Sequence, residues 1–280
     1  MKLACSSMFF TDPTYVEKLQ HARRLGYEGI EVRLEESPEL DQQSNEIVAA
    51  HADSPVKVAA VVVRSPAYRA PLDSEEARVA KLSSARTALQ IAARLGVGTL
   101  VQPEYVSQNP PPSFYQLQKP TNEEKERLYR FLTEAADYAE KVNSKIMLEP
   151  INRYEGHYSH RIEETITIID QVGSSRIGVC IDFFHMNIEE ADIPTSIEIG
   201  RRYIDHVQLG DSNRLLPGEG HIDFTSGFAA LNRIGYTKYL ALECMIPLDT
   251  DRQLFKCLAY LQHCLKIATK SIGENSIEKN

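Results

Sequence analysis

Four side chains with oxygen donors stand at the ends of short apolar segments in the second half of the chain. They are Glu149, Asp182, Gln208 and Glu243. Parallel strands gather their carboxyl ends at one edge, where barrels and open α/β sheets keep their chemistry. A proline directly after Glu149 supports a strand end there, because proline is tolerated only at the edges and ends of strands. We therefore expect the four side chains to meet at one place.

Three carboxylates in one place would repel one another and raise their own pKa values unless a cation lay between them. A divalent metal ion removes this repulsion, and ligation by oxygen alone suits Mg²⁺ or Mn²⁺ better than Zn²⁺ or Cu²⁺. The sequence therefore predicts one divalent metal ion, Mn²⁺ or Mg²⁺, with Co²⁺ as a further alternative. The competing interpretation, in which each acid caps a helix or pairs with an arginine, suits one strand end better than four successive ones.

The remaining chain consists of strands alternating with helices, which must hold these four ends in place. Predicted strands span residues 2–6, 29–33, 56–63, 98–102, 146–149, 177–182, 204–211 and 239–243. Predicted helices follow them at about 13–25, 42–51, 74–95, 122–142, 161–172, 196–203, 224–234 and 249–268. Strict alternation requires a parallel sheet, and eight units favour a closed barrel over an open doubly wound sheet. No GxGxxG motif follows the first strand, which weakens a dinucleotide-binding interpretation.

Start and stop signals support these boundaries. Asp12 and the proline after it indicate the start of the first helix, and Thr121 with Glu124 forms a capping box for the helix at 122–142. A glycine ends several helices, as Gly26 does, and supplies the left-handed cap of a helix-to-strand turn. We predict an α/β fold, a single (β/α)8 TIM barrel over residues 1–270, followed by a polar C-terminal tail at 271–280.

Composition narrows the class of protein further. The chain has 280 residues, is 42% hydrophobic and carries a net charge of −8, which argues against nucleic acid as a partner. It has no apolar run of about 18 residues, so no membrane span is predicted. The five cysteines form no CxxC motif and suit buried reduced thiols. The first residues are too quickly polar for a signal peptide, and we expect a cytoplasmic protein.

Several motifs resemble those of the xylose-isomerase-like barrels, the sugar isomerase/epimerase superfamily. They are Leu148-Glu149-Pro150 with Glu155 six residues after the first glutamate, Ile181-Asp182 with His185 three on, Gly210 to Arg214 followed by Pro217 to Phe224, and Leu242-Glu243. The resemblance covers nearly the whole chain. In motif the chain is most similar to the ketose 3-epimerases of the tagatose/allulose type.

The resemblance implies roles for individual residues. Glu149, Asp182 and Glu243 match metal ligands, and the two glutamates among them also match the groups that move the substrate proton. The residues that match substrate-oxygen contacts are Glu155, His185 and Arg214. Members of the superfamily are often oligomers, so a homodimer or homotetramer acting on a small sugar substrate is expected.

Two departures from the epimerase pattern bear on the site. Gln208 stands where the epimerases place histidine, and a branch similar to hydroxypyruvate isomerase carries glutamine there and keeps its metal. His206 lies on the same strand face, about 6–7 Å deeper at roughly 3.3 Å per residue. We expect Gln208 to be the ligand and His206 to be a core residue or a partner of a ligand. The chain also has no tryptophan, so the expected aromatic walls of a sugar site are Phe9, Phe10, Tyr105, Tyr115 and Phe183.

The predicted chemistry is proton transfer beside a carbonyl. A metal held by the carbonyl oxygen and the adjacent hydroxyl oxygen of a sugar would acidify the C–H between them and stabilise a cis-enediolate. Carboxylates on both sides could remove the proton from one face and return it to the other. The expected function is therefore that of a ketose 3-epimerase. An aldose–ketose isomerase of the hydroxypyruvate type, or a sugar lyase or dehydratase on the same site, remains an alternative.

Two further features concern the substrate. Arg33, Arg64, Arg153 and Arg214 fall at or after strand ends, which suits an anionic substrate, a sugar acid or sugar phosphate. Pairing of Arg33 and Arg64 with Glu35, Glu36 and neighbouring acids is the alternative. The long loop at 103–120 is rich in proline and aromatic residues and is expected to act as a lid.

Apurinic-site endonucleases share this fold but use three zinc ions and several histidines. Strands three and four here offer Arg64 and Gln102 instead.

Overall fold

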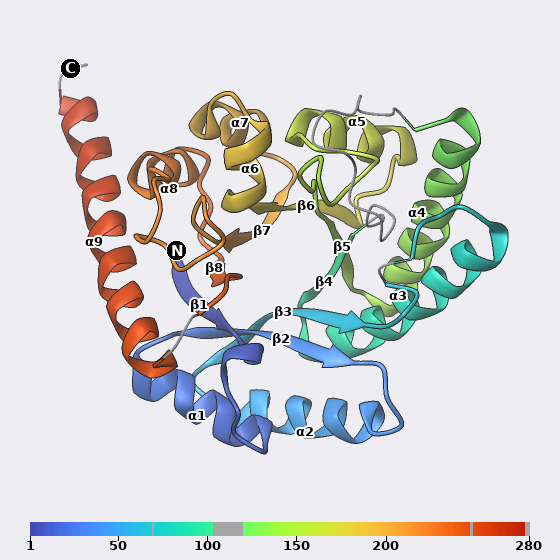
Figure 1. The fold of residues 1–280 in the computed structure, drawn as a ribbon, viewed down its shortest axis with the longest axis horizontal. Helices are drawn as coiled ribbons and strands as arrows, with labels where there is room; N and C mark the ends of the chain where they lie inside the picture. Colours follow the sequence, from blue (N-terminus) through green and yellow to red (C-terminus); the bar gives the residue numbers. More distant parts are fainter. Residues whose placement is uncertain (69, 103–119, 247–248, 278–280) are drawn as a thin grey trace.

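The computed structural model describes residues 1–68, 70–102, 120–246 and 249–277. Eight parallel strands close into a barrel in the order β1 to β8, and helices surround it (Figure 1). The predicted α/β class and single (β/α)8 barrel are therefore confirmed. The predicted division between barrel and tail at residue 270 stays a prediction. In the described residues, none of the helices combines the length and apolar character needed to cross a membrane.

The strands match the predicted segments closely. They are β1 Lys2–Ser6, β2 Gly29–Glu35, β3 Lys57–Arg64, β4 Gly98–Val101, β5 Lys145–Leu148, β6 Ile177–Asp182, β7 Ile204–Leu209 and β8 Tyr239–Leu242. The α-helices are α1 Tyr15–Leu25, α2 Leu40–Asp53, α3 Glu75–Leu95, α4 Asn122–Val142, α5 Ile162–Val172, α6 Phe183–Glu189, α7 Ile193–Ile199, α8 Phe224–Arg233 and α9 Thr250–Ile277. A 3-10 helix, η1, spans Ser7–Phe9.

Local sequence accounts for most helix ends. Thr121 and Glu124 form the predicted capping box of α4, and Gly26 ends α1 with a φ of 95°. The predicted start of α1 at Asp12 is wrong by two residues. Thr14 caps α1 and forms a capping box with Glu17, while the Asp12 carboxylate bonds His21 instead.

The last four strands are consecutive neighbours in the closed barrel. β1 pairs with β8 through Leu3 and Leu240, and β6 pairs with β7 so that Asp182 lies opposite Gln208. This register places the ends of β5 to β8 along one part of the carboxyl rim. The sequence spacing alone could only suggest that arrangement.

The core has two parts. A large apolar layer fills the space between the strands and the helices. A smaller cluster inside the barrel contains Ala60, Val62, Leu100, Met147 and Cys180. Because apolar side chains fill this interior section, the polar side chains of the barrel lumen are confined to its remaining levels.

Three aromatic rings pack together where α6 meets α8, next to the carboxyl rim of the barrel. Phe183, the first residue of α6, stacks on Phe224 of α8 with ring centroids 5.5 Å apart, and Phe228 packs beside both rings. Gly227 permits this contact, since a Cβ there would lie 2.4 Å from the Phe183 ring. The packing holds α6 against the end of β6, next to Asp182.

Candidate active site

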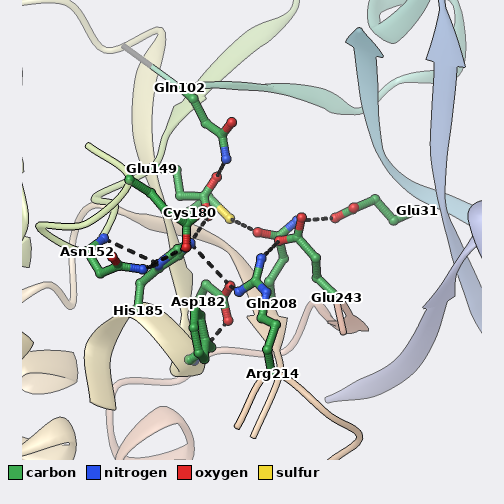
Figure 2. Close-up of polar contacts among 12 residues, drawn as sticks. Glu31, Gln102, Glu149, Asn152, Cys180, Asp182, His185, Gln208, Arg214 and Glu243 are labelled. Atoms are coloured by element: carbon green, nitrogen blue, oxygen red, sulfur yellow. Dashed lines mark hydrogen bonds and ion pairs between the residues drawn. The ribbon is translucent and has the colours of Figure 1, made fainter. Parts of the chain in front are cut away.

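The side chains predicted at the strand ends gather at the carboxyl end of the barrel (Figure 2). Glu149 follows β5, Asp182 ends β6, Gln208 lies in β7 and Glu243 follows β8. The first three have no exposed surface, and Glu243 keeps 8%. A buried cluster of three carboxyl groups is costly unless each group is neutralised, paired or bound to a cation.

Two arginines supply positive charge to this cluster. Arg33 from β2 contacts Glu243, and Arg214 from the loop after β7 contacts Asp182. The Arg214 guanidinium also lies 3.7 Å from a Glu243 oxygen and 4.4 Å from the Phe184 ring centre. Arg214 adopts a left-handed φ of 63°, a backbone conformation that is uncommon for residues other than glycine.

These contacts separate the pKa values of the three acids. Burial, and then the charges of Glu243 and Asp182, raise the pKa of Glu149 well above its usual range. Burial also raises the pKa of Asp182, and contact with Arg214 limits the rise to about 6. Burial acts in the same direction on Glu243, but Arg33 and Arg214 outweigh it and lower its pKa to about 2. Without a bound cation, Glu149 therefore tends to keep its proton while Glu243 stays ionised.

Some buried oxygens of the cluster have no hydrogen-bond partner among the described residues. They are Glu149 Oε1, Glu243 Oε2 and Gln102 Oε1. A buried carboxylate oxygen without a partner costs free energy, which binding of a cation would recover. The two glutamate oxygens thus fit a hard divalent metal ion, and they belong to two of the four predicted ligands.

The orientation of the Gln208 amide also fits a metal. Its Nε2 donates to Glu31 Oε2 at 2.9 Å, and Glu31 accepts because it is a carboxylate. Its Oε1 is therefore the atom left for the interior of the barrel, where the Cys180 thiol lies 3.5 Å away. His206 contacts the same Glu31 oxygen at 2.9 Å and also lines a cavity at the amino end of the barrel. Its predicted place outside the ligand set stays a prediction.

His185 lies closer to the acids than the sequence indicated. Its Nε2 is 3.6 Å from Glu149 Oε1 and 3.7 Å from Asp182 Oδ2. Ligand atoms of these three residues lie within 4.8 Å of one another, so geometry alone would allow them to share a metal ion. Burial, and then the charge of Arg214, lower the pKa of His185 to about 4, so the imidazole is neutral near pH 7.

Comparison with known proteins places this arrangement in a family. A family model described as the xylose isomerase-like TIM barrel matches residues 19–260. The chain belongs to this family. Its relatives include a D-psicose 3-epimerase of Enterocloster bolteae, 36% identical over 117 residues, and an L-ribulose 3-epimerase of Mesorhizobium japonicum, 34% identical over 141 residues. These alignments cover 42% and 50% of the chain, and 39% and 48% of the two relatives, so they span less than half of each relative.

A solved structure agrees in fold. The apo 3-keto-D-glucoside 4-epimerase of E. coli superposes with a TM-score of 0.83 over 94% of this chain and 100% of its own, at 24% identity. At that identity the likeness establishes the fold alone. The predicted resemblance to the sugar isomerase/epimerase superfamily is confirmed, and ketose 3-epimerases are among its relatives.

The residues predicted to contact the substrate also lie near this rim, and they differ in how closely they approach the carboxylates. Arg214 and His185 reach the carboxylates, as described above. Glu155 is half-buried in the loop after β5, where it accepts from Asn152 Nδ2 at 2.9 Å. The roles of all three residues stay predictions.

The four arginines predicted for an anionic substrate divide into two groups. Arg33 and Arg214 contact the site. Arg153 instead forms an ion pair with Glu189 at 2.7 Å, and Arg64 lies 3.3 Å from Glu35. Arg153 and Arg64 are thus engaged by neighbouring acids, and for Arg64 this is the pairing that the sequence offered as an alternative.

Three residues near the acids were missed as parts of the site. Gln102 Nε2 donates to Glu149 Oε2 at 2.7 Å, Glu31 bonds Gln208, and Asn152 bonds His185 Nδ1. Gln102 follows β4 directly, so the rule that found the four ligands also applies to it. Glu31 had another signal, a carboxylate between Ile30 and Val32 in a predicted strand, which needs a partner if it is buried.

The predicted lid and aromatic walls have mixed outcomes. Residues 103–119 lie outside the described residues, and with them the lid and two of the tyrosines. Phe183 is fully buried among the α8 rings, and Phe10 is buried against His21 with ring centres 4.7 Å apart. Both therefore belong to the core, because helix packing takes up the faces that a sugar would need.

Proposed function

We propose that this chain is a divalent-metal-dependent sugar epimerase that moves a proton beside a carbonyl through a cis-enediolate, in the manner of the ketose 3-epimerases. One observation carries the proposal. Two buried glutamates, Glu149 and Glu243, share one site, their pKa values are shifted in opposite directions, and each has an oxygen without a hydrogen-bond partner among the described residues. Such a pair offers an acid and a base in one place.

The donor set supports a metal ion in this site. Glu149, Asp182, Gln208 and Glu243 would hold Mn²⁺ or Mg²⁺, since all four offer oxygen. When bound, the ion supplies positive charge beside the substrate carbonyl, which acidifies the neighbouring C–H. Co²⁺ remains an alternative, since the ligand types do not separate it from Mn²⁺.

The two glutamates then divide the proton transfer. Glu243, which Arg33 and Arg214 keep ionised, is suited to accept the substrate proton, and Glu149 on the other side is suited to deliver a proton and to take one up again in the reverse direction. Gln102 donates to one Glu149 oxygen and leaves the other free, which orients the acid. Return to the opposite face of the same carbon gives epimerisation.

The remaining groups position the substrate. We propose that Glu155, His185 and Arg214 hold substrate oxygens, and that the unpartnered Gln102 Oε1 accepts from a sugar hydroxyl. Two arginines beside the site also suit a sugar acid or phosphate. The named activities of the relatives, on psicose, ribulose and keto-glucoside sugars, support a ketose or keto-sugar substrate.

A second candidate is an aldose–ketose isomerase of the hydroxypyruvate type, and Gln208 at the fourth ligand position favours it. A sugar lyase or dehydratase would use the same acids. We also propose a cytoplasmic homodimer or homotetramer. The five cysteines, all buried as free thiols, support the reducing compartment.

Wash-in of solvent deuterium tests the proposed function. The metal-loaded protein is incubated in heavy water with D-psicose, L-ribulose and hydroxypyruvate in turn, and label and products are followed by NMR. Deuterium at C3 with the inverted sugar is expected for an epimerase, whereas a product with a shifted carbonyl indicates the isomerase and loss of water indicates the dehydratase. Absence of exchange with each sugar, in protein with a full complement of metal, would contradict the proposal.

A further inference from the structure

Two nitrogen atoms of Asn152 contact the Nδ1 atom of the His185 imidazole. The backbone N–H of Asn152 donates to His185 Nδ1 at 3.2 Å, and Asn152 Nδ2 lies 2.7 Å from the same ring atom (Figure 2). A backbone N–H can only donate a hydrogen bond. Nδ1 must therefore be the acceptor in this contact and carries no hydrogen.

Neighbouring hydrogen-bonding groups fix which end of the Asn152 amide is the oxygen and which is the NH₂. Its Oδ1 accepts from the backbone N–H of Tyr154 at 2.9 Å, and its Nδ2 faces the Glu155 carboxylate at 2.9 Å. Exchanging the oxygen and nitrogen would place an NH₂ against an N–H donor and an oxygen against a carboxylate. Nδ2 is therefore the atom that faces His185, and it is a second donor to Nδ1.

With Nδ1 engaged as an acceptor, the ring hydrogen lies on Nε2. We infer that Asn152 is a positioning residue that holds His185 as the Nε2–H tautomer, so that His185 donates a hydrogen bond to the substrate and does not ligate the metal. The inference rests on the proposed function for the identity of the acceptor, a sugar oxygen. The tautomer itself rests only on the contacts described above.

The tautomer decides between two uses of one position. Glu149, Asp182 and His185 are close enough to share an ion, but a nitrogen that carries a hydrogen has no lone pair for a metal. Oxygen ligands then remain, which keeps the site suited to a hard cation. An N–H aimed into the site can instead stabilise negative charge that develops on a sugar oxygen during proton transfer.

Burial makes this control effective. Asn152 and His185 are each 1% exposed, so little water competes for the ring nitrogens. Asn152 also shapes its loop, because its carbonyl accepts from the backbone N–H groups of Glu155 and Gly156. A loop role alone would leave the tautomer of His185 and the choice of metal unchanged when the side chain is replaced by a close isostere.

The test is a measurement of the ring nitrogens at constant pH near 7.5. Protein labelled with ¹⁵N-histidine is recorded metal-free and with diamagnetic Mg²⁺, and the His185 signals are assigned by their loss in His185→Gln. The wild-type protein is expected to show a hydrogen on Nε2 and none on Nδ1. A hydrogen on Nδ1 in the wild-type protein would overturn the inference, whatever the variants do.

Asn152→Asp is the informative variant, because it keeps the shape of the side chain and replaces the donor by an acceptor. It is expected to move hydrogen onto Nδ1 and to raise the ratio of bound Zn²⁺ to Mn²⁺ at least about tenfold, since imidazole suits zinc. The ratio is measured after dialysis against equal concentrations of both ions. Asn187→Asp places the same charge on α6, two residues beyond His185, and is expected to change neither quantity.

The outcomes separate the two proposals. An unchanged tautomer in folded Asn152→Asp protein, or a moved hydrogen with an unchanged metal ratio, would contradict the role given to Asn152. These readouts need no turnover, so they stand even if the wild-type protein fails to exchange any sugar proton. Conversely, exchange of deuterium into a sugar by a protein with the opposite tautomer would leave the proposed function intact and overturn only this inference.

Discussion

Charged groups are buried at the carboxyl end of the barrel and form partly exposed ion pairs at its amino end. At the carboxyl end, buried acids have shifted pKa values and oxygens without hydrogen-bond partners among the described residues. At the amino end, Lys145 and Lys238 both pair with Asp205 beside an open cavity of about 430 Å³, and the Lys238 side chain is 55% exposed. Solvent-exposed ion pairs contribute little to the free energy of folding, whereas burying a charged group without a partner reduces that stability strongly. The cavity at the amino end is therefore bordered by charged groups that are already paired.

The largest effect is expected from changing the acids at the carboxyl end. Glu243→Gln keeps an oxygen for a metal but removes the base, and Glu149→Gln removes the acid. Turnover should fall by about 10²–10⁴ or more in either variant, since general acid–base catalysis contributes that much. Solvent-deuterium wash-in measures the loss, and elemental analysis checks that metal remains bound.

The matched control is Glu198→Gln on α7, where Glu198 pairs with Arg233 at the surface. It should leave exchange at the wild-type rate. If Glu243→Gln also exchanged the substrate proton at that rate, the base would have to be sought elsewhere on the rim, first at His185.

The next effect concerns stability and pH. Burial raises the pKa of Asp182 to about 6 in the folded protein, against 3.8 as the ordinary value; Arg214 limits this rise and the charge of Glu243 adds to it. The folded state then binds more protons than the unfolded state between these pH values, so stability falls as pH rises from about 4 to 6. The loss is on the order of 3 kcal/mol for metal-free protein at 1.36 kcal/mol per pKa unit.

Urea unfolding of wild-type protein and Asp182→Asn, compared from pH 4 to pH 7, isolates this contribution. The stability of the wild-type protein relative to the variant should decrease with pH without metal. Added Mg²⁺ or Mn²⁺ should remove the decrease, because a cation stabilises the ionised acid. A difference that stays constant with pH in the metal-free proteins would refute the assignment.

A smaller effect is expected at the arginine of the rim. Arg214→Ala should raise the KM for the substrate roughly 10- to 100-fold, since a hydrogen bond to a charged group contributes about 1.5–3 kcal/mol. Deuterium exchange at saturating sugar should still be detectable. Arg153→Ala is the control, because Arg153 pairs with Glu189 rather than with the clustered acids. Equal effects of the two variants would argue against a substrate contact for Arg214.

The smallest effect is expected at the amino end. Lys238→Met removes one of two lysines that pair with Asp205, and it should change the free energy of unfolding by less than about 1 kcal/mol. The exchange rate should not change. A large loss of activity in this variant would break the contrast between the two ends, and would show that the amino end matters for the reaction.

Much of the architecture could be predicted because it depends on local signals. Strand lengths, glycine caps and the capping box at Thr121 require only neighbours in sequence. The errors arose where a distant residue decided the outcome. Asp12 fits the pattern of a cap, but His21 takes its carboxylate. The helix α6 was missed because Phe183 and Phe184 continue the apolar run of β6, and only packing against α8 shows that the chain has turned.

The sequence by itself determined which residues end the strands, since hydrophobic runs and proline signals are local, and it therefore identified the four oxygen donors. Tertiary structure alone decided which atoms the side chains around the site turn toward it. Glu31 turns the Gln208 amide, Asn152 holds one nitrogen of His185, and Arg153 is drawn away to Glu189. These choices depend on hydrogen bonds between segments that become neighbours only when the barrel closes, and such contacts leave no periodic pattern in the chain.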